Sequence, residues 1–361
     1  MRYNVLKVKK YLFLLLCISA IVASDIRKIN IEGLSSDNIN SIYYGENGIL
    51  WLATDQGLNK YDGVNNSVYR SNPFITTALN GNRIWHVEGY NTDTLLVVSD
   101  NALHLFTPKN YSFIRFNIES RPTSIYKDGS EFWVTSRDKG VYRLDQNKTL
   151  HHYKFDPLNP FSIPTSEFEF TDGVRFATDN DGKTWLATEK GLCSIDKNTN
   201  FVSRYFRSNT NNKLLSDKIN SLYFENGVLY IGTEKGLNYL SVKDMAFTSE
   251  NDLKNYKIYN IIKDDDTLLV VTDRGIFSVD AKTVNRFSEQ RFKLITTGLQ
   301  GDILWSKNST NFYYNGTIEN VKATISQIVN TKNGDFLIST NEGVYTFGKS
   351  ESGVFESNKK L

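Results

Sequence analysis

The sequence predicts a single all-β propeller built from four-stranded blades, and three observations carry this prediction. One apolar phrase with the form of a β-hairpin recurs eight times, about every 41 residues. The composition favours strands, because 13% of the residues are aromatic and only 6 residues are Pro. A strand with no hairpin of its own stands before the first copy, where it can close a ring.

The recurring phrase is an apolar strand, a tight turn and a second strand. Its copies span residues 50–62, 95–107, 132–145, 184–196, 229–241, 268–280, 303–315 and 336–348. Six copies carry a glycine at one place in the turn, which a short hairpin loop holds at positive φ. Ala102 and Asn311 stand there in the other two copies that lack it. Aromatic residues before the turns, among them Trp51, Trp133 and Trp185, are expected to pack between neighbouring sheets.

A further strand precedes most copies and a shorter one follows, which gives four strands per blade. The hairpin count predicts eight blades, and seven is the alternative because the copy at 303–315 is degenerate. We expect residues 26–31 to complete the last blade and so join the two ends of the ring. The alternative is that the C-terminal segment 353–357 completes that blade itself.

The first 24 residues have the pattern of a secretory signal peptide. A basic start is followed by an apolar stretch over 11–23 and a small residue for cleavage. This stretch is shorter than the roughly 20 residues that span a bilayer, and an uncleaved anchor is one alternative. A lipoprotein leader that uses Cys17 is the other, although Leu16 stands before it where a small residue is expected. We therefore expect a periplasmic or secreted protein, with a leader over 1–24, a propeller over 25–357 and a tail over 358–361.

Charge and motifs exclude several classes of function. The net charge is +2 with a pI near 8.2, which is too balanced to indicate nucleic acid or an anionic membrane surface as partner. None of the 4 histidines has metal-ligand spacing, and adjacent His151 and His152 on a strand point to opposite faces. Cys193 has no partner for a disulfide in the mature chain. We expect no cofactor, no metal and no catalytic residue.

The residue before each inner strand is basic in four of seven copies. The seven positions carry Asn38, Arg83, Arg121, Asp172, Lys218, Lys257 and Thr324. They should ring one mouth of the central channel, with Trp85 two residues further into its strand. Because Arg and Lys bind carboxylate or sulfate groups and aromatic rings stack on sugars, we predict that the four basic residues and Trp85 bind an acidic oligosaccharide. The alternative is solvated loop charges with local acidic partners such as Asp217.

Two copies, with the link before them, carry a resemblance to a known repeat. They read LSSDNINSIYYGENGILWLATDQGLNKYDG over 34–63 and LSDKINSLYFENGVLYIGTEKGLNYL over 215–240. These segments resemble the two-component regulator propeller repeat, and weaker copies extend the resemblance over nearly all of the mature chain. It implies the extracytoplasmic sensor of a bacterial receptor that ends in a histidine kinase or a diguanylate cyclase. Many propellers of that family sense oligosaccharides.

The sequence departs from that family in having one propeller and no output domain. We therefore expect a truncated or stand-alone receptor portion that binds a small molecule or an oligosaccharide and acts with a membrane-bound histidine kinase or diguanylate cyclase component. The alternative is a secreted propeller enzyme, either a lyase or a glycan hydrolase. An enzyme would need acid, base or metal groups clustered at one mouth of the channel.

Overall fold

A computed structural model describes residues 25–348, apart from 76–77, 170–173, 265–266, 280–283, 289–297, 301–302, 306–308, 315–316 and 332–333. Its described strands form eight four-stranded antiparallel sheets, here called blades 1 to 8 in chain order. In each of blades 1 to 7 the four strands follow one another in sequence. The all-β propeller predicted from the repeats is therefore confirmed.

The strand bounds follow the repeat. Blades 1 and 2 contain β2 (Ile39–Tyr44), β3 (Leu50–Thr54), β4 (Gly57–Tyr61) and β5 (Asn66–Tyr69), then β6 (Ile84–Gly89), β7 (Leu95–Ser99), β8 (Ala102–Thr107) and β9 (Ser112–Asn117). Blades 3 and 4 contain β10 (Pro122–Asp128), β11 (Glu131–Ser136), β12 (Gly140–Leu144) and β13 (Leu150–Tyr153), then β14 (Phe176–Thr178), β15 (Lys183–Thr188), β16 (Gly191–Asp196) and β17 (Val202–Tyr205). Short 3₁₀ turns lie at Pro108–Asn110 and Ser208–Thr210.

Blades 5 and 6 contain β18 (Ile219–Glu225), β19 (Val228–Thr233), β20 (Gly236–Ser241) and β21 (Ala246–Ser249), then β22 (Ile258–Asp264), β23 (Thr267–Thr272), β24 (Gly275–Val279) and β25 (Val284–Ser288). Blades 7 and 8 contain β26 (Gly298–Gln300), β27 (Ile303–Trp305), β28 (Asn311–Tyr314) and β29 (Thr317–Asn320), then β30 (Ile325–Asn330), β31 (Phe336–Thr340), β32 (Gly343–Gly348) and β1 (Asp25–Lys28). The degenerate copy at 303–315 thus contains a paired strand hairpin, β27 with β28.

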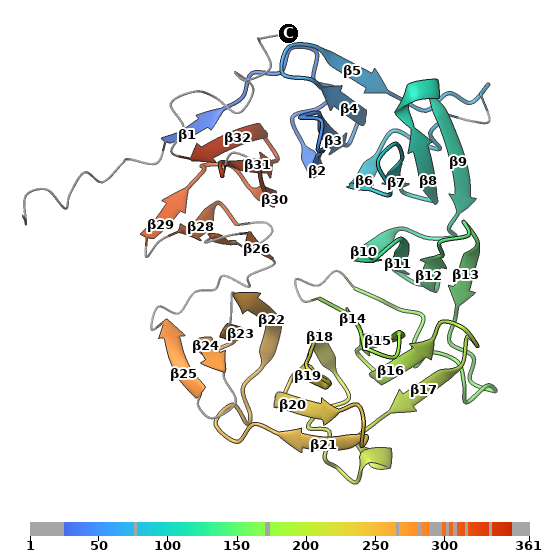
Figure 1. Cartoon of the computed structure of the whole chain (residues 1–361), viewed down its shortest axis with the longest axis vertical. Helices are drawn as coiled ribbons and strands as arrows, with labels where there is room; N and C mark the ends of the chain where they lie inside the picture. Colours follow the sequence, from blue (N-terminus) through green and yellow to red (C-terminus); the bar gives the residue numbers. More distant parts are fainter. Residues whose placement is uncertain are drawn as a thin grey trace, which may run out of the picture.

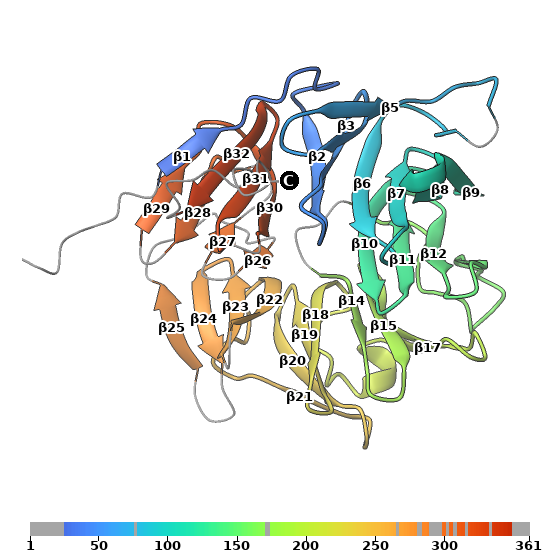
Figure 2. The ribbon, with the colours of Figure 1, turned by 45° about the horizontal axis from the view of Figure 1, so that its top comes forward.

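The blades stand around a central axis, with their first strands facing it (Figure 1). The view of Figure 2 shows the blades as tilted sheets that follow one another around the ring. All inner strands run in the same sense, so one end of the ring collects the starts of the inner strands and the turns between second and third strands. We call this end the entry face. The far face collects the turns between first and second strands and between third and fourth strands.

Aromatic side chains fill the space between neighbouring blades. Trp51 of blade 1 packs among buried residues of blade 2, including Val97 and Phe106. Trp133 of blade 3 and Trp185 of blade 4 pack in the same way against the blade that follows each. All three tryptophans are buried. Because each sheet can cover only part of its surface alone, this packing is what couples the blades, as the sequence predicted.

The ring closes through the N-terminal strand. β1 pairs antiparallel with β32, and the register joins Asp25 to Gly348 and Lys28 to Tyr345. β1 is the outer strand of blade 8, whose other three strands come from the end of the described chain. The prediction that residues 26–31 complete the last blade is therefore confirmed. The leader 1–24, the segment 353–357 and the tail 358–361 lie outside the described residues.

The hairpin glycines adopt the backbone conformation that their place in the turn predicts. The φ angle is +135° at Gly57, +126° at Gly191 and +135° at Gly236. The turn is reinforced by the threonine that ends the second strand. Thr54 Oγ1 donates to the carbonyl oxygen of Gly57 at 2.8 Å and accepts the backbone N–H of Gln56. Equivalent threonine bonds recur in blades 4, 5, 6 and 8.

A buried histidine makes the stability of blade 2 depend on pH. His104 is fully buried, its Nε2 accepts the backbone N–H of Asn80, and its Nδ1 lies 3.3 Å from the carbonyl oxygen of Val97. Burial lowers the pKa of His104 to about 4, against 6.5 for the free side chain. The folded state therefore excludes a proton that the unfolded chain binds between these two values.

Above pH 6.5 we expect His104 to leave the free energy of unfolding unchanged. Below that pH, protonation of His104 in the unfolded chain should lower the free energy of unfolding as the pH drops toward 4. The loss should be about 3 kcal/mol, from about 1.4 kcal/mol per pKa unit. Denaturant unfolding at pH 7, 6, 5 and 4 measures it, and His104→Gln should flatten the profile in that window. A wild-type profile with the same slope as the variant would contradict this account.

Candidate functional site

The structure divides the predicted mouth into two separate groups. Arg83, Arg121, Lys218 and Lys257 directly precede β6, β10, β18 and β22, so all four stand at the entry face. β6 and β10 belong to neighbouring blades 2 and 3, whereas β18 and β22 belong to neighbouring blades 5 and 6 elsewhere on the ring (Figure 1). The first group, with Trp85, is here called the arginine group, and the second the lysine group.

In the arginine group, two guanidinium groups contact Trp85. Arg121 lies with its guanidinium carbon 3.8 Å from the centre of the Trp85 ring, and Arg83 lies 5.6 Å from it. Trp85 Nε1 donates to Asp100 Oδ1 at 2.6 Å, and Arg83 Nε lies 3.3 Å from Asp55 Oδ1. Arg121 therefore covers part of the indole surface that was predicted to stack on a sugar.

In the lysine group, acidic side chains neutralise both ammonium groups. Lys218 Nζ lies 3.4 Å from Glu189 and 3.5 Å from Glu234, and Lys257 Nζ lies 3.0 Å from Glu234. Burial alone would raise the pKa of Glu234, but the hydrogen bonds and charges of Lys257 and Lys218 outweigh it and hold that pKa below its ordinary value. Tyr259 lies beneath Lys257, 5.1 Å from its Nζ. The lysine group is thus an ion-pair network across two blades.

The acids that make these pairs come from one repeated position that the sequence reasoning missed. It is the residue after the Thr or Ser that ends the second strand of a blade. Asp55, Asp100, Glu189, Glu234 and Asp273 occupy it in blades 1, 2, 4, 5 and 6. The expected single basic ring is therefore corrected to alternating basic and acidic residues. Asp217, the acid considered from the sequence, instead accepts the backbone N–H of Arg207.

Blade 3 differs from these five blades, because Arg137 stands at this position. Arg137 is exposed, and its backbone N–H donates to the carbonyl oxygen of Arg121. Burial lowers the pKa of Arg121, Asp100 opposes that shift, and the charges of Arg83 and Arg137 lower it further. Three arginines thus face two carboxylates at this side of the entry face, which leaves an excess of positive charge there.

The remaining entry positions do not add to a basic mouth. Asn38 Nδ2 donates to Asp55 Oδ2 at 2.7 Å, and the backbone N–H of Thr324 donates to Asn341. Asp172 lies outside the described residues. Arg175, directly before β14, pairs with Ala187 as Ser41 pairs with Ala53, so it lies within the inner strand and not at the entry position. Arg175 is buried and donates to the carbonyl oxygen of Glu169.

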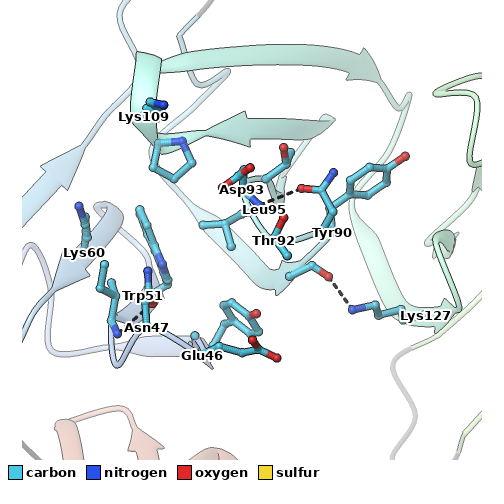
Figure 3. Close-up of a pocket in the computed structure, with 17 residues that line it drawn as sticks. Glu46, Asn47, Trp51, Lys60, Tyr90, Thr92, Asp93, Leu95, Lys109 and Lys127 are labelled. Atoms are coloured by element: carbon cyan, nitrogen blue, oxygen red, sulfur yellow. Dashed lines mark hydrogen bonds between the residues drawn. The ribbon is translucent and has the colours of Figure 1, made fainter.

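A groove of about 560 Å³ opens on the far face between blades 1 and 2. Its walls include the turns between the first and second strands of both blades, and Figure 3 shows the side chains that line it. The aromatic and charged lining residues are Tyr43, Glu46, Trp51, Lys60, Tyr90, Asp93, Lys109 and Lys127. Lys127 Nζ closes one end by donating to the carbonyl oxygen of Gly89 at 2.6 Å. No sequence pattern had indicated this groove.

Metal-ligating side chains do not gather in the part of the chain that the structure describes: no three His, Cys, Asp or Glu residues there could hold an ion together. The adjacent histidines have separate local partners. His151 Nε2 lies 2.8 Å from Asp145 Oδ2, and His152 Nε2 lies 2.6 Å from the carbonyl oxygen of Lys139. Over the same described residues, no helix has the length and apolar character to cross a bilayer.

The fold and the two sites define a β-propeller with a polar entry face and a separate inter-blade groove. Its repeat is identified by the family model of the two component regulator propeller, which matches residues 33–56 and confirms the resemblance read from the sequence. No curated protein matches the chain.

Many solved structures share the fold, and the following three are among them. The extracellular domain of the putative hybrid two component system BT3049 from B. thetaiotaomicron is 20% identical, with a TM-score of 0.50, over 90% of this chain and 42% of that one. The corresponding domain of BT4673 from the same organism is 15% identical, with a TM-score of 0.53, over 90% and 39%. The computationally designed Ika8 protein is 9% identical, with a TM-score of 0.59, over 90% and 99%. The chain spans about two fifths of the length of the two extracellular domains.

Proposed function

We propose that this chain is an extracytoplasmic ligand-binding sensor module of a bacterial signalling system. The observation that carries the proposal is the two component regulator propeller repeat at residues 33–56, in a propeller whose fold is shared by extracellular domains of hybrid two component systems. The signal-peptide pattern of residues 1–24 supports a periplasmic or secreted location. A membrane-bound histidine kinase or diguanylate cyclase component would relay the signal.

The arginine group is the part of the predicted site that we propose to bind an acidic oligosaccharide. Arg83, Arg121 and Arg137 gather their charge over a small area, while the whole chain carries a net charge of only +2. A local concentration of charge at the mouth of a ring attracts anions even when the net charge is low. Lys218 and Lys257 are already neutralised by Glu189 and Glu234, so they should contribute less.

The double variant Arg83→Ala with Arg121→Ala should weaken binding of a uronate or sulfated oligosaccharide about tenfold or more, because two charge-assisted hydrogen bonds are lost. Calorimetry on the exported protein measures this after a thermal-shift panel has selected the sugar. Wild-type binding should also weaken as salt rises, since exposed charges are screened over about 8–10 Å.

The matched control is the double variant Lys218→Ala with Lys257→Ala, which removes the same formal charge from the other side of the entry face. It should bind the selected sugar with nearly wild-type affinity. If both double variants bind equally well, or if the lysine variant is the weaker binder, the arginine group is not the site. If the protein is retained in the cytoplasm, the sensor assignment itself fails.

A further inference from the structure

The groove on the far face exists because one junction between blades lacks the contacts that close its counterpart. The strand register makes blades 1 and 3 directly comparable. Trp51 pairs with Lys60 in blade 1, as Trp133 pairs with Arg143 in blade 3. Tyr43 pairs with Trp51, as Tyr126 pairs with Trp133. The junction of blades 3 and 4 therefore shows what the junction of blades 1 and 2 would need in order to be closed.

Between blades 3 and 4, the equivalent space is filled by a cationic and acidic cluster. Arg143 is buried over Trp133 and donates to the carbonyl oxygen of Lys197 at 3.1 Å. Lys197, in the turn after the third strand of blade 4, pairs with Asp128 at 2.7 Å and Glu131 at 3.6 Å. Each cation thus has a protein acceptor, and the junction is locked.

Between blades 1 and 2 the acceptors are missing. Gly45 and Ile49 stand where Asp128 and Glu131 stand in blade 3, by the same register. Blade 2 still offers a lysine from the turn after its third strand, Lys109, which is exposed. Lys60 reaches over Trp51, 6.0 Å from its ring centre. Within the described residues, neither lysine is within ion-pair distance of a carboxylate.

The other residues that line the groove indicate which kind of ligand it can bind. Ile49, Leu95 and Pro108 supply apolar surface, and Tyr43 adds a ring with a hydroxyl group. Burial raises the pKa of Tyr43, and the charges of Glu88 and Glu46 add to the rise, so its hydroxyl stays a hydrogen-bond donor. Figure 3 shows Glu46 at the end of the drawn groove opposite to Lys109. Asp93 also lines the groove, but among the described residues neither Glu46 nor Asp93 forms an ion pair with Lys60 or Lys109, so both ammonium groups can take an anion.

We propose that this groove is a binding site for a small organic anion with a flat apolar body, held by Lys60 and Lys109 as counter-charges. The anionic group takes the place that the Asp128 side chain occupies at the junction of blades 3 and 4, where Gly45 has no side chain, and the body of the ligand lies against Tyr43, Ile49 and Pro108. Lys60 is partly buried, and opposite charges attract more strongly there than on open surface, so Lys60 should contribute more than the exposed Lys109. The site is separate from the arginine group, because it lies on the other face of the ring.

Tryptophan signals can test this proposal directly. The chain has 5 tryptophans, so ¹⁵N-tryptophan labelling gives one indole signal for each, and Trp51→Phe and Trp85→Phe assign the two that matter. Titration with 2-naphthoate should shift the Trp51 signal, because Trp51 lines the groove, and leave the Trp85 signal in place. The neutral analogue 2-naphthalenemethanol should shift Trp51 far less. Equal shifts by both compounds, or no shift by naphthoate at millimolar concentration, would overturn the proposal.

Variants separate the groove from general surface charge. Lys60→Gln with Lys109→Gln should weaken naphthoate binding about tenfold or more, whereas Lys235→Gln, at an exposed lysine of the entry face, should not change it. Gly45→Asp should also weaken binding, because it restores an acid where Asp128 stands and leaves both lysines in the chain. Unchanged affinity in the Lys60 and Lys109 variant contradicts the proposal. The double variant at Arg83 and Arg121 should still bind naphthoate with wild-type affinity. The result for one site therefore does not decide the result for the other.

Discussion

Removal of residues 25–33 is expected to lower the melting temperature by about 10 °C and to make the protein associate. β1 provides the outer edge of blade 8 through its pairing with β32, and Ile26 packs against the core of that blade. Ile31 is buried in the cluster that joins blades 8 and 1. Loss of these side chains should cost about 3–5 kcal/mol, at about 2–4 °C per kcal/mol.

The association follows from the exposed edge. Without β1, β32 presents a row of unpaired backbone N–H and C=O groups that can pair with another molecule. Calorimetric melting and light scattering of the chains 25–361 and 34–361 measure both effects. A synthetic peptide of residues 25–33 should restore the melting temperature of the shorter chain, while a scrambled peptide should not. Equal melting of the two chains would show that blade 8 does not depend on β1.

Gly140→Ala should be among the most destabilising single substitutions in the ring, at about 3 kcal/mol. Gly140 has φ of +86°, and a Cβ there would overlap the backbone carbonyl oxygen of Tyr153 on the neighbouring strand. An L-residue at positive φ costs about 1–2 kcal/mol, and the overlap with backbone adds to this because β13 cannot move without breaking its pairing with β12.

Gly129→Ala is the matched control for this substitution. Gly129 also has positive φ, at +60°, but a Cβ there has no other atom within 4 Å. Gly129→Ala should therefore lower the free energy of unfolding only by the cost of an L-residue at positive φ, about 1 kcal/mol. Chemical denaturation of both variants gives the comparison. An equal decrease in the free energy of unfolding for both variants would mean that the overlap with Tyr153 does not destabilise the Gly140 variant.

The fold could be predicted because its determinants are local and repeated. Six of the turns place a glycine at positive φ, and Gly57, Gly191 and Gly236 show that it stands at constant spacing from the apolar strand. Ring closure was predictable for the same reason, since residues 26–31 form a strand that has no hairpin of its own. The degenerate copy at 303–315 keeps its strand pair without the glycine, but not in the way the sequence suggested, because Asn311 begins β28 and does not have a positive φ.

The sites were harder to predict because their contacts cross from one blade to the next. Arg83 meets Asp55 of the preceding blade, and Lys257 meets Glu234 in the same way. The acids were present in five of the hairpin phrases, after the Thr or Ser, but a reading along one copy at a time does not show which basic residue they face. The groove is open because Gly45 and Ile49 stand where blade 3 has two acids. This difference becomes visible only when the strands of blades 1 and 3 are aligned.

The pairing of β1 with β32 also determines which blade can fold last. The first strand of the described chain to leave the ribosome has its hydrogen-bonding partner about 320 residues later, in the last one. Blades 1 to 7 draw all four strands from contiguous sequence and can form as the chain grows, but blade 8 cannot. Contacts between such distant residues form slowly. Until β32 is available, the ring is therefore an open arc with β1 unpartnered, and it closes when β1 meets β32.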